Sequence, residues 1–137
     1  MLILYVGDLH HAEQWSRKED MQTPEIVGDL NFTDYTWACY GREWAYEPSC
    51  GRGHNIFCNN EVFFDSIRLA LVHDIIKPEE FMVLFFDGSM GEPKEVTFNQ
   101  SGVAIGGFPK GMFQEGMRLV QEIVLGGIKK RKGEQNA

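Results

Sequence analysis

Runs of apolar residues mark the strands that the chain is expected to form. Residues 2–6 (LILYV) are continuously apolar and end at a Gly-Asp pair, as in a short buried strand. Residues 81–86 (FMVLFF) are a solid apolar run, which predicts a central strand, and residues 95–98 alternate as its partner. A further short strand is expected at 103–105. Between residues 35 and 40, Tyr, Trp and Cys alternate with Thr, Ala and Tyr, and this period of two predicts another strand.

Two longer segments have the three- and four-residue spacing of apolar side chains that is typical of a helix. The first covers about residues 60–76. Asn59 and Asn60 supply a cap oxygen at its start, and Pro78 disfavours helical geometry just beyond its end. The second covers about residues 111–125 and is expected to stop at the Gly-Gly pair 126–127.

These elements together predict one α/β or α+β domain. The economical arrangement is a small mixed or antiparallel sheet packed by the two main helices, with a short exposed helix at 12–21. A chain of 137 residues is long enough for one hydrophobic core but not for two. We therefore expect a single domain over residues 1–127, followed by a basic, polar and disordered tail over 128–137.

Composition restricts the possible classes of function more than it restricts the fold. The chain has 20 Asp and Glu against 13 Lys and Arg, and the resulting net charge of −7 disfavours a general nucleic-acid binder. No apolar run approaches the roughly 18–20 residues that span a bilayer, and the first residues lack the basic region of a signal peptide. With an odd number of cysteines, three, we expect a cytoplasmic protein with reduced thiols and no membrane association.

A metal-dependent hydrolase is one candidate chemistry. Asp8 and His10 stand two residues apart just beyond the first strand, where both could ligate a metal, and Asp29 would complete the catalytic set. The run Gly-Asp-Leu-His resembles the opening motif of calcineurin-like metallophosphoesterases, and Gly28-Asp29 resembles their second motif. Their Gly-Asn-His element is here Gly-His-Asn (residues 53–55), and their C-terminal histidines are missing. The alternative is a capping aspartate followed by two surface histidines.

A structural zinc site is the second candidate. Four residues follow the spacing C-x10-C-x3-H-x3-C, which supplies enough ligands for a tetrahedral zinc: Cys39, Cys50, His54 and Cys58. The tight C-x2-C pair of common zinc motifs is absent, and free cysteines are often small buried hydrophobes. Three reduced cysteines without any cofactor are the interpretation we favour.

Aromatic residues gather between positions 32 and 46. Exposed aromatic side chains dominate the binding energy of many protein interfaces, whereas stacking on bases needs more positive charge than this segment carries. The candidate binding residues are Tyr35, Trp37, Tyr40, Trp44 and Tyr46. Aromatic residues on an alternating strand are otherwise core residues, and the sequence does not say which of these five are exposed.

Several short elements follow one another between residues 56 and 125. Cys-Asn-Asn-Glu (58–61) leads into FFDSIR (63–68), the turn IKPEE (76–80) precedes the aromatic strand, and Gly102 precedes FPKGMFQ (108–114). In order and spacing these elements resemble the C-terminal segment of ABC-type AAA ATPases, which are found in bacterial genomes and phage-defence systems.

The resemblance implies that packing elements are kept and catalytic elements are lost. The family's switch histidine, which senses the nucleotide γ-phosphate, is replaced by Asn59. The phosphate-binding loop and the acidic strand are absent, and residues 1–55 do not match the family's preceding segment. What the resemblance implies is a detached or convergent module that does not hydrolyse ATP by itself. Standalone fragments of this size occur among mobile-element and phage genes.

We therefore expect a small non-catalytic binding or regulatory protein. Its partner would be another protein, such as an ATPase, or a second copy of itself in a homodimer formed through the aromatic segment. The metal-dependent hydrolase and the zinc-stabilised binding domain are the alternatives.

Overall fold

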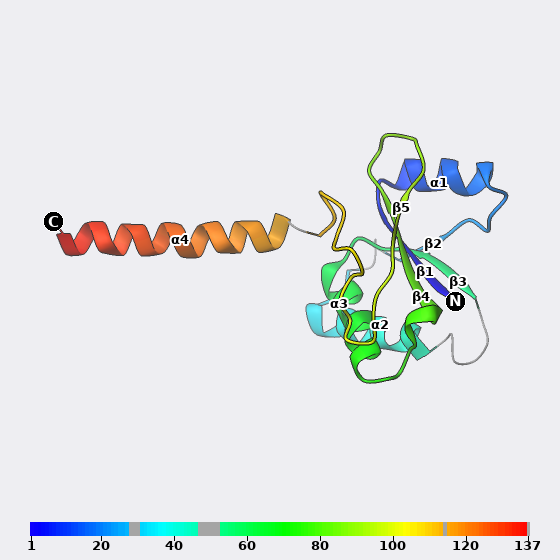
Figure 1. Cartoon of the computed structure of the whole chain (residues 1–137), viewed down its shortest axis with the longest axis horizontal. Helices are drawn as coiled ribbons and strands as arrows, with labels where there is room; N and C mark the ends of the chain where they lie inside the picture. Colours follow the sequence, from blue (N-terminus) through cyan, green and yellow to red (C-terminus); the bar gives the residue numbers. More distant parts are fainter. Residues whose placement is uncertain (28–30, 47–52, 114, 137) are drawn as a thin grey trace.

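A five-stranded mixed sheet with helices on both faces forms the body of the protein (Figure 1). The computed structural model describes residues 1–27, 31–46, 53–113 and 115–136. Strands run in the order β2-β3-β1-β4-β5, and all neighbouring strands are parallel except β5, which pairs antiparallel with β4. The α/β class with a mixed sheet is as predicted. The elements are β1 (Leu2–Gly7), α1 (Leu9–Lys18), β2 (Glu25–Ile26), α2 (Asp34–Tyr46), β3 (His54–Phe57), α3 (Glu61–Val72), β4 (Phe81–Phe86), β5 (Lys94–Val96) and α4 (Glu115–Asn136).

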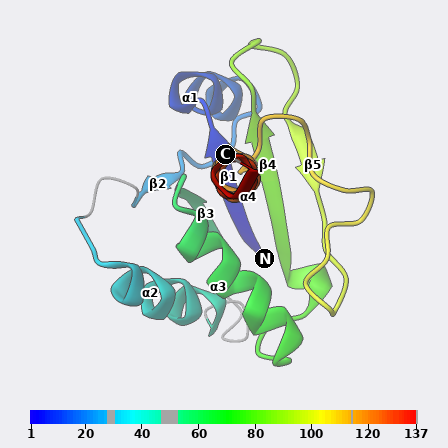
Figure 2. The ribbon, with the colours of Figure 1, turned by 90° about the vertical axis from the view of Figure 1, so that its left-hand side faces the viewer.

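Side chains on the two faces of the sheet form two separate apolar clusters. Successive residues of a strand point to opposite faces, so Leu4 of β1 joins the larger cluster and Tyr5 joins the smaller one. The larger cluster includes Trp37 of α2 and Phe63 of α3, whereas the smaller includes Ala12 of α1. Figure 2 shows α1 on one side of the sheet and the α2–α3 pair on the other.

The strands with solid apolar patterns are where the sequence predicts them. β4 is central, between β1 and β5. A partner strand is confirmed next to it, but β5 covers residues 94–96 instead of the predicted 95–98, with Val83 opposite Val96. The strand expected at 103–105 is wrong. That segment makes an isolated bridge between Phe98 and Ala104.

Helix α3 begins as predicted but ends four residues early. The Asn60 side chain accepts a hydrogen bond from the Phe63 amide at 2.9 Å, which satisfies one of the free donors at the helix start. After Val72 the chain turns through Asp74, whose φ is +58°, and the amide of Ile75 bonds back to Ala70. This local turn ends the helix at Val72, before the chain reaches Pro78.

The strand expected at 35–40 is wrong, because these residues belong to helix α2. Trp37, Gly41 and Ala45 are buried at four-residue spacing and face α3. Gly41 allows the two backbones to approach closely, since a Cβ there would lie 2.6 Å from the carbonyl oxygen of Phe63. The aromatic residues alternate in the sequence with the period of a strand, because aromatic side chains occur on the exposed face of α2 as well as on the buried one.

The end of the chain differs most from expectation. Helix α4 is not stopped by the glycines at 126–127 and runs on to Asn136, so the expected disordered tail at 128–136 is helical. It leaves the body as a straight arm instead of packing on the sheet (Figure 1). Its predicted place as the second packing helix is taken by α2, which has the most extensive contacts with α3. Within the described ranges no helix combines the length and apolarity of a membrane span.

Candidate functional site

The carboxyl ends of the parallel strands are the usual ligand site of an open α/β sheet, at the point where helices leave for opposite faces. Here that point lies between β1, followed by α1, and β3, followed by α3. Asn59 bridges the two strand ends: its Oδ1 accepts from the Gly7 amide at 2.7 Å, and its Nδ2 donates to the Gly7 carbonyl at 3.0 Å. Gly7 has a φ of +106°, and a Cβ there would lie 2.1 Å from the carbonyl oxygen of Phe86. Backbone and amide atoms of the protein itself therefore join β1 to both of its neighbours at this edge.

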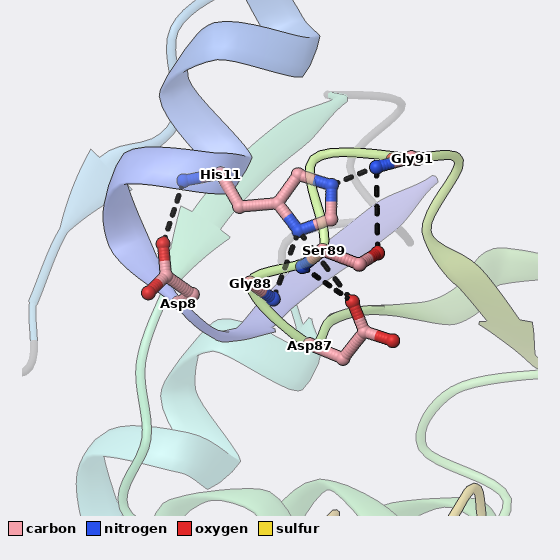
Figure 3. A network of polar contacts seen from close by, with 6 residues as sticks. All are labelled: Asp8, His11, Asp87, Gly88, Ser89 and Gly91. Carbon is pink, nitrogen blue, oxygen red and sulfur yellow. Dashed lines mark hydrogen bonds and ion pairs between the residues drawn. The ribbon is translucent and has the colours of Figure 1, made fainter.

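A polar network beside this point joins helix α1 to the loop after β4 (Figure 3). Asp8 caps α1, because its Oδ1 accepts a hydrogen bond from the His11 amide at 2.7 Å. The His11 ring is 1% exposed; its Nδ1 accepts from the Gly88 amide at 3.1 Å, and its Nε2 lies 2.6 Å from the Gly91 carbonyl oxygen. Since Nδ1 accepts, Nε2 carries the proton and donates to Gly91.

Asp87 lies at the edge of the same network. Its Oδ1 is 3.9 Å from His11 Nδ1 and accepts a hydrogen bond from the Ser89 amide at 2.9 Å. Hydrogen bonds from the side chain and backbone of Ser89 hold the pKa of Asp87 below its ordinary value. Each polar atom of the His11 ring has a backbone partner, so the geometry ties two elements together and leaves the ring without a free nitrogen for proton transfer.

The three residues of the hydrolase hypothesis have different surroundings. Asp8 is exposed and is used as the helix cap, and His10 is exposed in the first turn of α1. Asp29 lies outside the described residues. The expectation of two surface histidines is wrong for His11, which is buried. The sequence feature that indicates burial of His11 is its four-residue spacing from Trp15, which is typical of one helix face. Both residues contact Phe86.

Two of the residues in the zinc hypothesis, His54 and Cys58, lie too far apart to bind one ion. His54 opens β3 and Cys58 follows its end, so roughly 13 Å of extended chain separates them, whereas zinc ligands lie within about 2.3 Å of the metal. Cys39 is exposed on α2, and Cys50 lies outside the described residues. Within the part of the chain that the structure describes, no three His, Cys, Asp or Glu side chains are grouped to hold a metal. Burial raises the pKa of the Cys58 thiol, partly offset by a hydrogen bond from the backbone of Asn60.

The aromatic residues of segment 32–46 do not form one continuous exposed surface. Trp37 is 4% exposed and packs edge-on against Phe63, so it is a core residue. Tyr40 and Trp44 are half-buried against the same core. Tyr35 is 80% exposed, and Tyr46 is also exposed. As a docking surface this segment therefore offers Tyr35 and Tyr46, with parts of Tyr40 and Trp44.

A groove of about 660 Å³ lies where α4 leaves the body. The aromatic part of its lining is Phe64 of α3 together with Phe108 and Phe113. Arg68 lies 5.6 Å from the Phe64 ring centre and 5.3 Å from that of Phe108, and it forms an ion pair with Asp65 at 3.1 Å. Other lining residues are Glu61, Met112, Arg118, Val120 and Gln121. The lining of the groove thus combines aromatic and charged side chains.

Helix α4 carries the largest set of exposed apolar side chains in the described part of the chain. Apolar residues are exposed between 38% and 71% along one stripe, which we call the α4 stripe: Leu119, Val120, Ile123, Val124 and Ile128. Leu125 is 60% exposed but lies off this stripe, about 150° around the helix from its middle. Sequence reasoning found the amphipathic spacing of this segment but assigned its apolar face to the core.

Comparisons with known proteins add no relative. No protein-family model, no curated protein and no solved structure matches the chain. The resemblance of residues 56–125 to ABC-type AAA ATPases therefore stays a prediction.

Proposed function

We propose that the protein acts by binding another protein chain through the α4 stripe, without a catalytic step of its own. The observation that carries this proposal is the α4 stripe itself. A 22-residue helix extends from the body (Figure 1). Large apolar side chains are exposed along it. Contiguous exposed apolar surface of this kind is characteristic of association sites.

The sequence of α4 strengthens the proposal, because such a helix would be marginal without a covering partner. Gly126, Gly127 and Gly133 lie inside it, and each glycine costs about 1 kcal/mol relative to alanine in a helix interior. A helix of this length gains most of its stability from packing of its apolar face. A partner that covers the α4 stripe would supply that stability.

The polar edge of the sheet supports a structural role better than a catalytic one. Asp8 is used as a helix cap, and both nitrogens of His11 are hydrogen bonded to backbone atoms. The side-chain amide of Asn59 is likewise hydrogen bonded to the backbone of Gly7. These contacts hold the body together, and the extended helix α4 is the part we assign to recognition.

Site-specific photocrosslinking in living cells tests the proposal. A photoreactive amino acid at position 123 lies in the α4 stripe, and the same amino acid at position 125 is the matched control off the stripe. We expect a discrete protein adduct at 123 and none, or far less, at 125; the mass of the adduct shows whether the partner is a second copy or another chain. Equal crosslinking at both positions, or none at either, would refute the proposal.

A further inference from the structure

We infer that the partner of the α4 stripe is the α4 stripe of a second copy, and that the two helices pair antiparallel in a homodimer. This inference rests on the proposed function and names its partner. It is supported by the symmetry of the stripe and by the distribution of charge along the chain.

The α4 stripe has the same pattern when read from either end. Together with Gly127, which lies between Val124 and Ile128, its residues occupy positions 119, 120, 123, 124, 127 and 128, adjacent pairs repeating every four residues about a midpoint between Ile123 and Val124. A dimer about a two-fold axis uses the same patch on both copies, so the patch must be complementary to itself. Antiparallel pairing about this midpoint places Val120 opposite Gly127, where the absent side chain leaves room for the valine, and it places Leu119 at the same height as Ile128 of the second copy, on the flanks of the contact.

Charge decides between the antiparallel and parallel arrangements. Residues 129–132 are Lys-Lys-Arg-Lys, all exposed. In a parallel pair, eight cations of the two copies would lie side by side, and neighbouring like charges on helices are destabilising. In the antiparallel pair these runs lie at opposite ends, separated by most of the length of α4, which is about 33 Å.

The basic end of each helix then reaches the acidic body of the other copy. Residues 1–114 carry 17 acidic and 8 basic residues, a net charge of −9, whereas residues 115–137 carry 3 acidic and 5 basic residues, a net charge of +2. Antiparallel pairing places residue 132 opposite residue 115, where the partner's helix begins. The groove there is lined by two acidic and two basic side chains, Glu61, Asp65, Arg68 and Arg118. The attraction between the copies therefore comes from the opposite net charges of the helix segment and the body.

Sedimentation equilibrium and distance measurement on the full chain test the inference. A spin label at Lys132→Cys, with Cys39 and Cys50 changed to Ser, reports the separation of the two labelled ends. We expect a dimer in which the labelled backbone positions lie about 26 Å apart, because each is 8.5 residues from the midpoint. In the same protein Ile123→Asp should weaken the dimer at least about tenfold, whereas Leu125→Asp should leave it unchanged.

Two outcomes would overturn the inference. A dimer with labelled positions about 10 Å apart would be a parallel pair, since packed helix axes are separated by about 8–10 Å. A protein that stays monomeric would have no second copy on the stripe. In that case crosslinking at position 123 to a different protein would leave the proposed function standing, whereas absence of crosslinking would remove both.

Discussion

Replacing the buried histidine of α1 with phenylalanine should loosen the join between α1 and the loop after β4. His11→Phe keeps a ring of similar shape, so the edge-to-face contact with Phe86, at 5.1 Å between ring centres, can persist. What it removes are the two hydrogen bonds to Gly88 and Gly91. The substitution thus isolates the polar contribution of the imidazole from its packing.

The expected loss of stability follows from those two bonds. A hydrogen bond contributes about 0.5–1.5 kcal/mol net to folding, so two bonds amount to about 1–3 kcal/mol. Gly88 and Gly91 lie in an exposed loop, where water can replace the lost partner. The middle of the range, about 2 kcal/mol, is therefore expected, equivalent to roughly 5–10 °C in Tm for a chain of this size.

Equilibrium unfolding in urea, followed by far-UV circular dichroism, measures this loss. His10→Phe is the matched control, because His10 is the neighbouring exposed residue of the same helix turn, and its substitution should change the free energy of unfolding by less than about 0.5 kcal/mol. If His11→Phe proves as stable as His10→Phe, the buried imidazole does not join the two elements and the network is incidental.

Two further predictions concern residues that the sequence singled out. Trp37→Ala should destabilise the fold by about 3–5 kcal/mol because Trp37 is a core residue, whereas exposed Tyr35→Ala should change stability by less than about 0.5 kcal/mol; similar urea midpoints for the two variants would contradict the placement of Trp37 in the core. In a Cys50→Ser protein, Cys39 should react with a thiol reagent at once and Cys58 only on unfolding. Burial raises the pKa of the Cys58 thiol and keeps it protonated as the pH increases, so rapid reaction of both thiols in the folded protein would refute its burial.

The body of the fold could be predicted wherever local pattern and tertiary environment agree. The apolar run of β4 lies between two strands, and Asn60 caps α3 as its position suggests. The prediction of a strand at 35–40 is wrong because helix α2 carries aromatic residues on more than one face. The sequence therefore shows a period of two in addition to the four-residue spacing of Trp37 and Gly41.

The polar network and the arm depend on information that is not local. His11 is buried because the loop 87–92, about 80 residues away in the chain, folds over it, and neighbouring residues cannot signal such a contact. Helix α4 has an amphipathic pattern that the sequence reveals, but the same pattern fits a helix on its own core and a helix that packs on another chain. Only its position relative to the body distinguishes the two.

Hydrogen–deuterium exchange of α4 at a series of protein concentrations tests most directly whether another chain covers the stripe. Slow exchange of amides 117–128 at high concentration is expected, becoming faster on dilution, while amides of β1 and β4 stay unchanged because folding of the body does not depend on the dimer. In Ile123→Asp the α4 amides should exchange fast at every concentration. Equal exchange of these amides in the wild-type protein and in Ile123→Asp, at all concentrations, would contradict the claim that the α4 stripe is an interface.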